Sequence, residues 1–277
     1  MPPTSSSTLF TPSDVRLRKR TEKPGRLNWL MLPGGPGIGS DSLFELADSL
    51  NVSGKVWMVD LPGDGNNLRP ELSDPYLKWP GVLIEAAKAL APCVYVGHST
   101  GGMYLLDTPE LESCIEALVL ISSAPDSSWQ QKFAEMTRAN PLPAVEITTA
   151  EYVRDKTNQN LRAIAMASAE WNFTPPAVAL GREFLSRPPY NFSAVEWSDK
   201  NFDTTYSARW WPKSLPTLIL SGEKDRIVDQ SLWLNPRFQG SHVLHRIIPD
   251  SAHFPWLEKP SEVSAAFDEL CAAIQRH

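Results

Sequence analysis

Short apolar runs alternate with amphipathic stretches along most of the chain. Mainly apolar runs of strand length occur at residues 27–32, 56–60, 93–96, 115–121, 216–220 and 243–248, and the run at 115–121 is typical of a strand that is buried on both faces. Apolar residues at helical spacing occupy residues 41–50, residues 81–90 and a last helix from about Ser261. Strands that alternate with helices predict an α/β fold, with a mostly parallel central sheet and helices on both faces.

Residues 124–212 interrupt this alternation. They are proline-rich, contain helix-like stretches such as residues 150–171, and show few strand signals. Half of the ten tryptophans lie here: Trp129, Trp171, Trp197, Trp210 and Trp211. We predict that residues 1–123 and 213–277 form the core and that residues 124–212 form an inserted helical lid.

The tryptophans of this segment suggest that the lid has an aromatic underside. A lid residue that packs downward also lines the cavity beneath it. Candidates for the substrate pocket are Trp171, Trp197, Trp210 and Trp211. The alternative is that these side chains only pack the lid onto the core.

Length and composition indicate a soluble globular protein. The 277 residues suffice for one large domain or for a domain with an insertion, and 42% hydrophobic and 21% charged residues are ordinary values for this class. No apolar run approaches the roughly 18 residues that a membrane span requires. Residues 1–10 are rich in Pro, Ser and Thr and lack the apolar centre of a secretory signal. We therefore expect a cytoplasmic protein without a membrane span.

Charge and cysteine content restrict the partners. A net charge of −6 argues against a nucleic-acid partner. The basic run at residues 16–20 alternates along a predicted strand, which favours a solvated sheet face over a binding patch. Cys93, Cys114 and Cys271 lack metal-type spacing, so we expect buried thiols in a reducing compartment. We expect no metal, no cofactor and a small-molecule substrate.

The most informative motif spans residues 94–102, Val-Tyr-Val-Gly-His-Ser-Thr-Gly-Gly. A buried strand ends at a Gly-x-Ser-x-Gly turn, and a helix-compatible stretch follows. A side chain at Gly97 or Gly101 would strike the neighbouring strand or helix. Such a nucleophile elbow presents its serine at the start of a helix with the hydroxyl exposed. Ser99 is therefore the candidate nucleophile.

A serine hydroxyl is a poor nucleophile without an imidazole to accept its proton and a carboxylate to orient that imidazole. Loops after the carboxyl ends of parallel strands are where these groups gather. His253 follows the last predicted strand and is the candidate base. Asp225 follows the strand at residues 216–220 and is the candidate acid, with Glu223, Asp229 and Asp126 as its rivals.

Acyl transfer also requires donors that face the developing oxyanion. One donor is expected from the backbone N–H of Thr100, the residue after the nucleophile. The second is expected from the loop at residues 33–37, which follows a predicted strand. Gly35 is the candidate in this loop, because Pro36 has no N–H.

Taken together, these motifs resemble an α/β-hydrolase with a lid, of the branch that contains esterases, C–C hydrolases and proline iminopeptidases. The loop at 33–37, the Asp-Leu-Pro-Gly-Asp-Gly run at 60–65, the elbow at Ser99, the turn at Asp225 and the His253 loop appear in the family's order. The resemblance implies a cofactor-independent hydrolase and covers nearly the whole chain.

The chain departs from the family pattern at several positions. Pro33 stands where the family usually has His, and Ala252 stands where Gly normally precedes the catalytic histidine. Proline iminopeptidases more often carry Gly-Gly-Ser-Trp-Gly at the elbow, whereas this chain has Gly-His-Ser-Thr-Gly. Pro109 follows the elbow closely and predicts a short helix there.

The sequence thus favours a serine hydrolase that cleaves a small to medium, partly apolar ester through an acyl-enzyme. One alternative is a proline iminopeptidase-like aminopeptidase, in which Glu170 or Glu196 would bind the substrate ammonium. A second alternative, of another class, is a non-catalytic hydrolase-fold protein that binds a small ligand or a partner.

Overall fold

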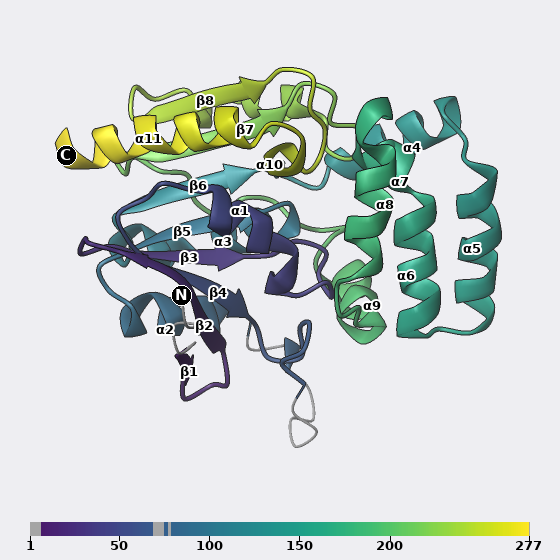
Figure 1. The fold of residues 1–277 in the computed structure, drawn as a ribbon, viewed down its shortest axis with the longest axis horizontal. Helices are drawn as coiled ribbons and strands as arrows, with labels where there is room; N and C mark the ends of the chain where they lie inside the picture. The colour runs from purple at the N-terminus through teal and green to yellow at the C-terminus, as the bar shows by residue number, and fades with distance from the viewer. Residues whose placement is uncertain (1–6, 69–74, 77–78, 277) are drawn as a thin grey trace, which may run out of the picture.

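A computed structural model describes residues 7–68, 75–76 and 79–276. Its centre is an eight-stranded sheet with the order β1-β2-β4-β3-β5-β6-β7-β8 (Figure 1). The strands are β1 (Thr8–Phe10), β2 (Arg16–Lys23), β3 (Asn28–Leu32), β4 (Gly54–Asp60), β5 (Cys93–His98), β6 (Ala117–Ile121), β7 (Thr217–Gly222) and β8 (Val243–Ile248). All pairs from β4 to β8 are parallel, and only those that involve β2 are antiparallel. The predicted, mostly parallel sheet is confirmed.

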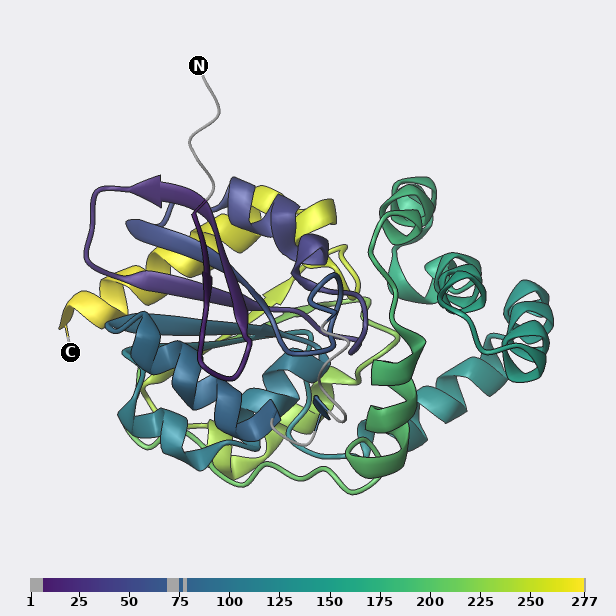
Figure 2. The same cartoon turned by 90° about the horizontal axis from the view of Figure 1, so that it is seen from below.

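Helices cover both faces of the sheet, as predicted. The core helices are α1 (Phe44–Ser49), α2 (Trp79–Ala89), α3 (Thr100–Leu106), α10 (Pro255–Glu258) and α11 (Pro260–Arg276). Figure 2 shows α1 and α11 on one side of the sheet and α2 and α3 on the other. Two clusters of buried apolar side chains, one on each face, hold these layers together.

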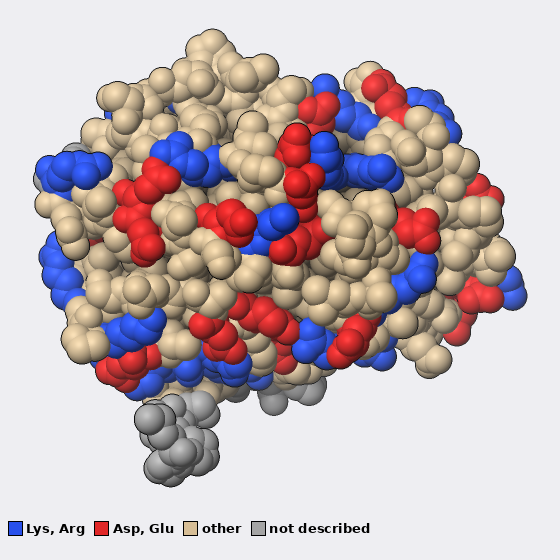
Figure 3. Space-filling view, turned by 45° about the horizontal axis from the view of Figure 1, so that its top comes forward, with Lys and Arg blue, Asp and Glu red and all other residues tan. Residues whose placement is uncertain are grey.

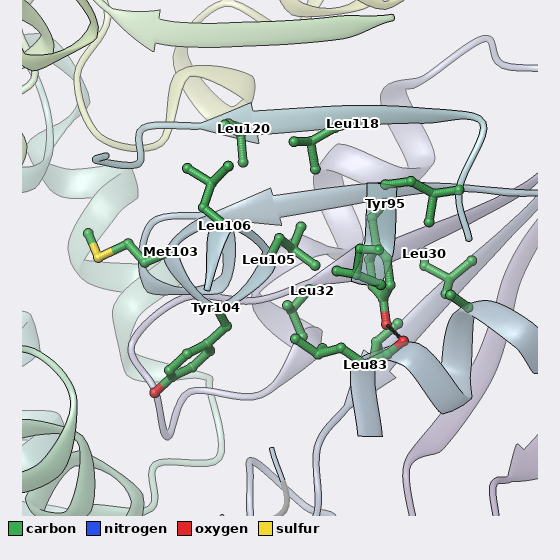
Figure 4. Close-up of a cluster of buried hydrophobic side chains, with 14 of the residues drawn as sticks. Leu30, Leu32, Leu83, Tyr95, Met103, Tyr104, Leu105, Leu106, Leu118 and Leu120 are labelled. Atoms are coloured by element: carbon green, nitrogen blue, oxygen red, sulfur yellow. Dashed lines mark hydrogen bonds between the residues drawn. The ribbon is translucent and has the colours of Figure 1, made fainter. Parts of the chain in front are cut away.

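Figure 4 shows the cluster beneath α3. Leucines of β3 and β6 meet side chains of α2 and α3 there, and the Tyr95 hydroxyl of β5 donates to the Leu83 carbonyl at 3.2 Å. Every residue of α3 is buried. Full burial of one large apolar side chain stabilises a fold by roughly 1.5–3 kcal/mol. The helix that follows the elbow is therefore anchored firmly on the sheet.

Between β6 and β7 the chain forms a series of helices. They are α4 (Trp129–Ala139), α5 (Pro143–Arg154), α6 (Asn158–Ala167), α7 (Ala169–Asn172), η4 (Pro175–Ala177), α8 (Val178–Ser186) and α9 (Phe192–Asn201). They lie beyond the carboxyl ends of the strands (Figures 1 and 2). The α5 helix packs on α6, and α6 packs on α8.

Some helix boundaries differ from the predicted ones. The helix-like stretch at 150–171 is divided, because the chain extends at Asp155 and the Thr157 hydroxyl caps a new helix by accepting from the Asn160 N–H at 3.1 Å. Residues 41–50 begin as a 3₁₀ turn, η1 (Ser40–Leu43), before α1 starts. The helix after the elbow ends at Leu106 and is short, as expected from Pro109.

The basic run lies on β2, where Arg16 and Arg18 form ion pairs with Asp60. Basic and acidic side chains are interspersed over the face shown in Figure 3.

All three cysteines are free. Only Cys93 is fully buried, whereas Cys114 and Cys271 are partly exposed, which corrects the expectation of three buried thiols.

No helix in the described part of the chain has the length and apolarity needed to cross a bilayer.

The turn from β5 to α3 leaves no space for side chains at its two glycines. A Cβ atom on Gly97 would lie 2.6 Å from the backbone nitrogen of Gly102, and one on Gly101 would overlap the Pro33 carbonyl oxygen. Real Cβ atoms essentially never make such contacts, so the strand, the helix and the neighbouring loop require glycine at both positions. The steric prediction made from the motif is confirmed.

Gly101→Ala should therefore destabilise the protein by about 1–3 kcal/mol, the usual cost of overpacking a rigid interior. Thermal unfolding measures this change. Gly81→Ala is the matched control, because a Cβ atom at Gly81 in α2 meets nothing within 4 Å. The control should show no loss of stability. Equal melting temperatures for the two variants would contradict the steric account.

Candidate active site

Ser99 lies at the sharp turn between β5 and α3. Its φ of 50° is uncommon for a residue other than glycine. The turn is held by the Ser99 N–H, which donates to the Ile121 carbonyl at 2.8 Å, and by the Ser123 hydroxyl, which donates to the Ser99 carbonyl at 2.8 Å. Contacts from the end of β6 thus stabilise the strained backbone that carries this serine.

Asp225 and His253 form a buried pair on the loops after β7 and β8. The His253 Nδ1 lies 3.0 Å and 3.2 Å from the two carboxylate oxygens of Asp225. Their side chains are 5% exposed for His253 and 0% for Asp225. Because a carboxylate only accepts hydrogen bonds, the Nδ1 is the donor in this contact, which makes Nε2 the nitrogen with the lone pair in the neutral ring. This is the tautomer that a general base requires.

Asp225 accepts further hydrogen bonds that were not predicted from the sequence. Its Oδ1 accepts from the N–H groups of Ile227 and Val228 at 2.9 and 3.1 Å, and its Oδ2 accepts from the Gln230 amide at 3.2 Å. The Ser221 hydroxyl donates to the Gln230 amide oxygen, which orients the amide. No motif in the sequence marks Gln230, because its role depends on how the loop folds back.

The three rival carboxylates make other contacts. Glu223 accepts from the Asp250 N–H at 3.2 Å. Asp229 pairs with Lys132 at 2.8 Å, and Asp126 accepts from the N–H of a neighbouring serine at 3.0 Å. Of the four carboxylates considered from the sequence, Asp225 is the one bonded to His253.

His98, beside Ser99, contacts the loop of the candidate base. Its Nε2 lies 3.1 Å from the His253 carbonyl oxygen, and the centroids of the two rings are 4.9 Å apart. Burial, and then the proximity of His253, lower the pKa of His98 well below its usual value. A neutral His98 therefore donates from Nε2 and links the elbow to the His253 loop, a contact the sequence did not predict.

The remaining histidines have packing contacts or lie outside the described residues. The ring nitrogens of His242 and His245 are 2.8 Å and 2.7 Å from backbone carbonyl oxygens. His277 is outside the residues that the structure describes. Both described side chains are therefore anchored to backbone groups.

The candidate oxyanion loop touches the elbow. The Thr100 hydroxyl donates to the Gly35 carbonyl at 3.1 Å. A Cβ atom on Gly34 would lie only 2.7 Å from the Ser99 Cβ. The structure therefore brings the two residues chosen from the sequence as oxyanion donors, Gly35 and Thr100, into contact with each other next to Ser99.

A buried carboxylate lies next to this loop. The Oδ1 of Asp64, which is 3% exposed, accepts from the Gly37 N–H at 2.9 Å and from the Gly65 N–H at 2.8 Å. Burial, and then the negative charge of Asp60, raise the pKa of Asp64 to about 7. The sequence indicated the Asp-Leu-Pro-Gly-Asp-Gly run only as a family motif and assigned no role to Asp64.

Two of the predicted pocket tryptophans lie on helices between β6 and β7. Trp171 is buried in α7, and the next residue, Asn172, accepts the His253 N–H at 3.1 Å. Trp197 of α9 packs against Trp79, with ring centroids 5.5 Å apart. The contact of Trp197 agrees with the packing alternative, whereas Trp171 adjoins the backbone that contacts His253.

The other two tryptophans make packing contacts with the core. The Trp210 indole donates to the Leu105 carbonyl of α3 at 2.8 Å. The guanidinium of Arg237 lies 4.3 Å from the centroid of the Trp211 ring. These contacts agree with the packing alternative for Trp210 and Trp211.

A hollow of about 990 Å³ separates the α7–α8 segment from the loop of the candidate acid. Its apolar wall includes Phe173, Leu180 and Leu257, and charged residues such as Lys224 and Arg226 lie opposite. Ser99 is not one of the described residues that line it. Asp225 does line it, so the hollow reaches the candidate acid but not the candidate nucleophile.

Among the described residues, no group of three or more His, Cys, Asp or Glu side chains is placed to hold a metal ion. Several polar groups at the carboxyl end of the sheet are hydrogen-bonded to one another, such as Asp225 with His253 and Thr100 with Gly35. Their arrangement provides a serine on a tight turn, a buried carboxylate–imidazole pair and a glycine loop.

A sequence model of the Alpha/beta hydrolase family matches residues 29–266. The chain belongs to the alpha/beta hydrolase family. It is similar to a pimeloyl-[acyl-carrier protein] methyl ester esterase of Xylella fastidiosa (strain 9a5c), with 23% identity over 88% of this chain and 95% of that protein. Family membership and esterase-named relatives support a hydrolase.

Solved structures share the fold at low identity. A proline iminopeptidase-related protein from Thermus thermophilus superposes with a TM-score of 0.73 at 20% identity, covering 98% of this chain and 99% of that one. An alpha/beta fold family hydrolase from Bacillus anthracis str. Sterne gives a TM-score of 0.75 at 14% identity, covering 96% and 99%. These similarities confirm the architecture of an α/β-hydrolase.

The raised pKa of Asp64 predicts a pH-dependent effect on stability. The native state binds this proton more tightly than the unfolded chain, whose pKa is near the ordinary 3.8. Asp64 therefore lowers the free energy of unfolding as the pH rises from about 4 to about 7. Asp64→Asn does not titrate, so its melting temperature relative to that of the parent should be higher at pH 8 than at pH 5. The same difference at both pH values would contradict the assigned shift.

Proposed function

We propose that this chain is a serine hydrolase that cleaves small to medium, partly apolar esters through an acyl-enzyme. The observation that carries the proposal is the buried Asp225–His253 pair, on loops at the same edge of the sheet as the Ser99 turn. Relatives named as methyl ester esterases support an ester as the substrate.

In the first half of the proposed reaction, the Ser99 hydroxyl attacks the acyl carbon while the His253 Nε2 accepts its proton. Asp225 holds the ring through Nδ1 and stabilises the imidazolium that forms. The backbone N–H groups of Gly35 and Thr100 bind the oxyanion of the tetrahedral intermediate. The alcohol then leaves with the proton from His253, and the acyl group remains on Ser99.

In the second half, water replaces the alcohol. His253 accepts a proton from the water, which attacks the acyl carbon and forms a second tetrahedral intermediate. Collapse of this intermediate breaks the bond to Ser99, and His253 returns the proton to the serine oxygen. The products are the carboxylic acid and the free enzyme, and no cofactor takes part.

We also propose that residues 124–212 form a lid over a core made of residues 1–123 and 213–277. The helices α4 to α9 leave the sheet after β6 and return before β7, on the side where the candidate site lies. The segment contacts the site directly, since Asn172 accepts the His253 N–H. An apolar roof at this place would favour the apolar part of an ester.

Two observations weigh against an aminopeptidase. Such an enzyme would need a free carboxylate for the substrate ammonium, but Glu170 pairs with Arg182 at 2.9 Å and Glu196 pairs with Lys156. Both glutamates named from the sequence are therefore neutralised by cations. A non-catalytic binding protein is distinguished by the labelling experiment that follows.

Ser99→Ala should abolish ester hydrolysis and covalent labelling by a fluorophosphonate, since the attacking oxygen is removed. Intact mass spectrometry and p-nitrophenyl butyrate turnover measure the two effects. Ser122→Ala is the matched control, because Ser122 is also buried and has a positive φ at the end of the next strand. It should keep both activities. Labelling that persists in Ser99→Ala, or a parent that does not label, would contradict the proposal.

Asp225→Asn should lower kcat by about 10³ to 10⁴, because an amide in place of the carboxylate no longer holds the required tautomer of His253. Asp126→Asn provides the comparison and should have little effect, since Asp126 bonds within its own turn. Steady-state kinetics test both variants. Severe damage in Asp126→Asn with a mild effect of Asp225→Asn would reverse the assignment.

The proposed lid predicts how activity depends on chain length. Apolar burial contributes roughly 25 cal/mol per Å², so kcat/KM for p-nitrophenyl esters should increase over a few added carbons and then fall when the pocket is full. Trp171→Ala or Trp197→Ala should shift this optimum. Trp211→Ala serves as the control, because Arg237 already covers that ring. If Trp171→Ala and Trp197→Ala both keep the parent's profile, these side chains only pack.

A further inference from the structure

The candidate oxyanion loop, residues 33–37, has few groups that could fix its own conformation. Pro33 and Pro36 have no N–H to donate, and Gly35 and Gly37 have φ values of 110° and 93°, which favour glycine. A loop of this kind has many accessible conformations. Catalysis through a backbone N–H needs one of them, so the loop must be held by other parts of the chain.

Gly37 is held at both of its backbone polar groups. Its N–H donates to the Asp64 carboxylate at 2.9 Å, and its carbonyl accepts from the Asn191 N–H at 2.7 Å. A Cβ atom on Gly37 would lie 2.5 Å from the Asn191 carbonyl oxygen. The loop is therefore clamped between the turn after β4 and the start of α9.

The carboxylate at position 64 is costly to the fold. Burial, and then the negative charge of Asp60 on β4, raise the pKa of Asp64. Burial raises the pKa of Tyr104, on α3, and the charge of Asp64 contributes to this rise. Arg16 and Arg18, on β2, form ion pairs with Asp60, and Arg18 also pairs with Asp41. A turn alone does not need a buried acid here, but the N–H of Gly37 does need an acceptor.

We propose that Asp64 is a positioning residue of the candidate active site, whose carboxylate fixes Gly37 and thereby sets the direction of the Gly35 N–H toward the oxyanion. This inference rests on the proposed serine hydrolase function. Asp64 does not touch the substrate. It acts through the loop, and its effect is greatest in the transition state, when the charge on the oxyanion develops.

The expected size of the effect follows from this indirect role. Removal of an entire oxyanion donor lowers kcat by about 10²–10³ in other enzymes. Loss of the carboxylate that accepts from the Gly37 N–H leaves the Gly35 N–H in the chain as a donor but allows it to move. We therefore expect a loss of about 10- to 100-fold in kcat, with KM nearly unchanged because substrate binding in the ground state does not use the oxyanion contacts.

Three substitutions at Asp64 distinguish a positioning role in catalysis from a purely structural role. Asp64→Ala and Asp64→Leu remove the acceptor, and leucine fills the space and removes the buried charge, so at least this variant should fold. Asp64→Asn keeps an oxygen that accepts from the N–H groups of Gly37 and Gly65. Asp126→Leu is the control for loss of a carboxylate away from the loop.

The readouts are kcat and KM for p-nitrophenyl butyrate and the inhibition constant of an alkyl trifluoromethyl ketone, whose adduct with Ser99 carries an oxyanion. Asp64→Leu should lower kcat and weaken the ketone by similar factors, while Asp64→Asn and Asp126→Leu should stay close to the parent in both. A merely structural role would lower the melting temperature without this paired loss.

Two outcomes overturn the inference. One is a folded Asp64→Leu with the kcat and ketone affinity of the parent. The other is an Asp64→Asn that loses as much as Asp64→Leu, since the acceptor is then not what matters. If the parent itself is neither labelled by a fluorophosphonate nor active on esters, the proposed function fails instead, so the two failures are distinguishable.

Discussion

Parallel pairing of the strands from β4 to β8 is the constraint on which the whole arrangement depends. In a parallel sheet all carboxyl ends lie at one edge, so the loops after β3, β5, β7 and β8 meet there although they are far apart in the sequence. The glycine loop, the Ser99 turn, the Asp225 loop and the His253 loop are these four. Burial of apolar side chains on both faces of the sheet keeps the strands in register.

At that edge of the sheet, close packing of backbone atoms rather than charge determines the geometry of the loops. The elbow and the glycine loop approach so closely that Gly34, Gly97 and Gly101 leave no room for a Cβ atom. The polar groups then bond in pairs across loops, as His98 does with the His253 carbonyl and Thr100 with the Gly35 carbonyl. Each loop is therefore oriented by its neighbours, and little of the site depends on one element alone.

The sequence predicted the features that arise from local pattern. Continuous apolar runs marked the buried strands, and the Gly-x-Ser-x-Gly turn marked Ser99. The structure places Asp225 and His253 together, as expected from loops after parallel strands. The sequence indicated no role for Gln230, His98 or Asp64. In a sequence, a polar loop residue that makes specific contacts cannot be distinguished from one that is exposed to solvent. Contacts such as that between His98 and His253 join residues 155 positions apart, and no periodicity carries such information. The division of residues 150–171 was not predicted, because it depends on the extended backbone at Asp155 and on the capping hydroxyl of Thr157.

The helices between β6 and β7 are joined to the sheet edge by two backbone hydrogen bonds. One runs from the His253 N–H to Asn172, and the other from the Asn191 N–H to Gly37. Each ends on a loop that holds part of the proposed chemistry, one the imidazole and the other the glycines. A displacement of these helices from the sheet would break both bonds and would remove one of the contacts that hold each loop. Under the proposed function, the segment that would cover the substrate is thus coupled by backbone hydrogen bonds to the imidazole loop and to the glycine loop.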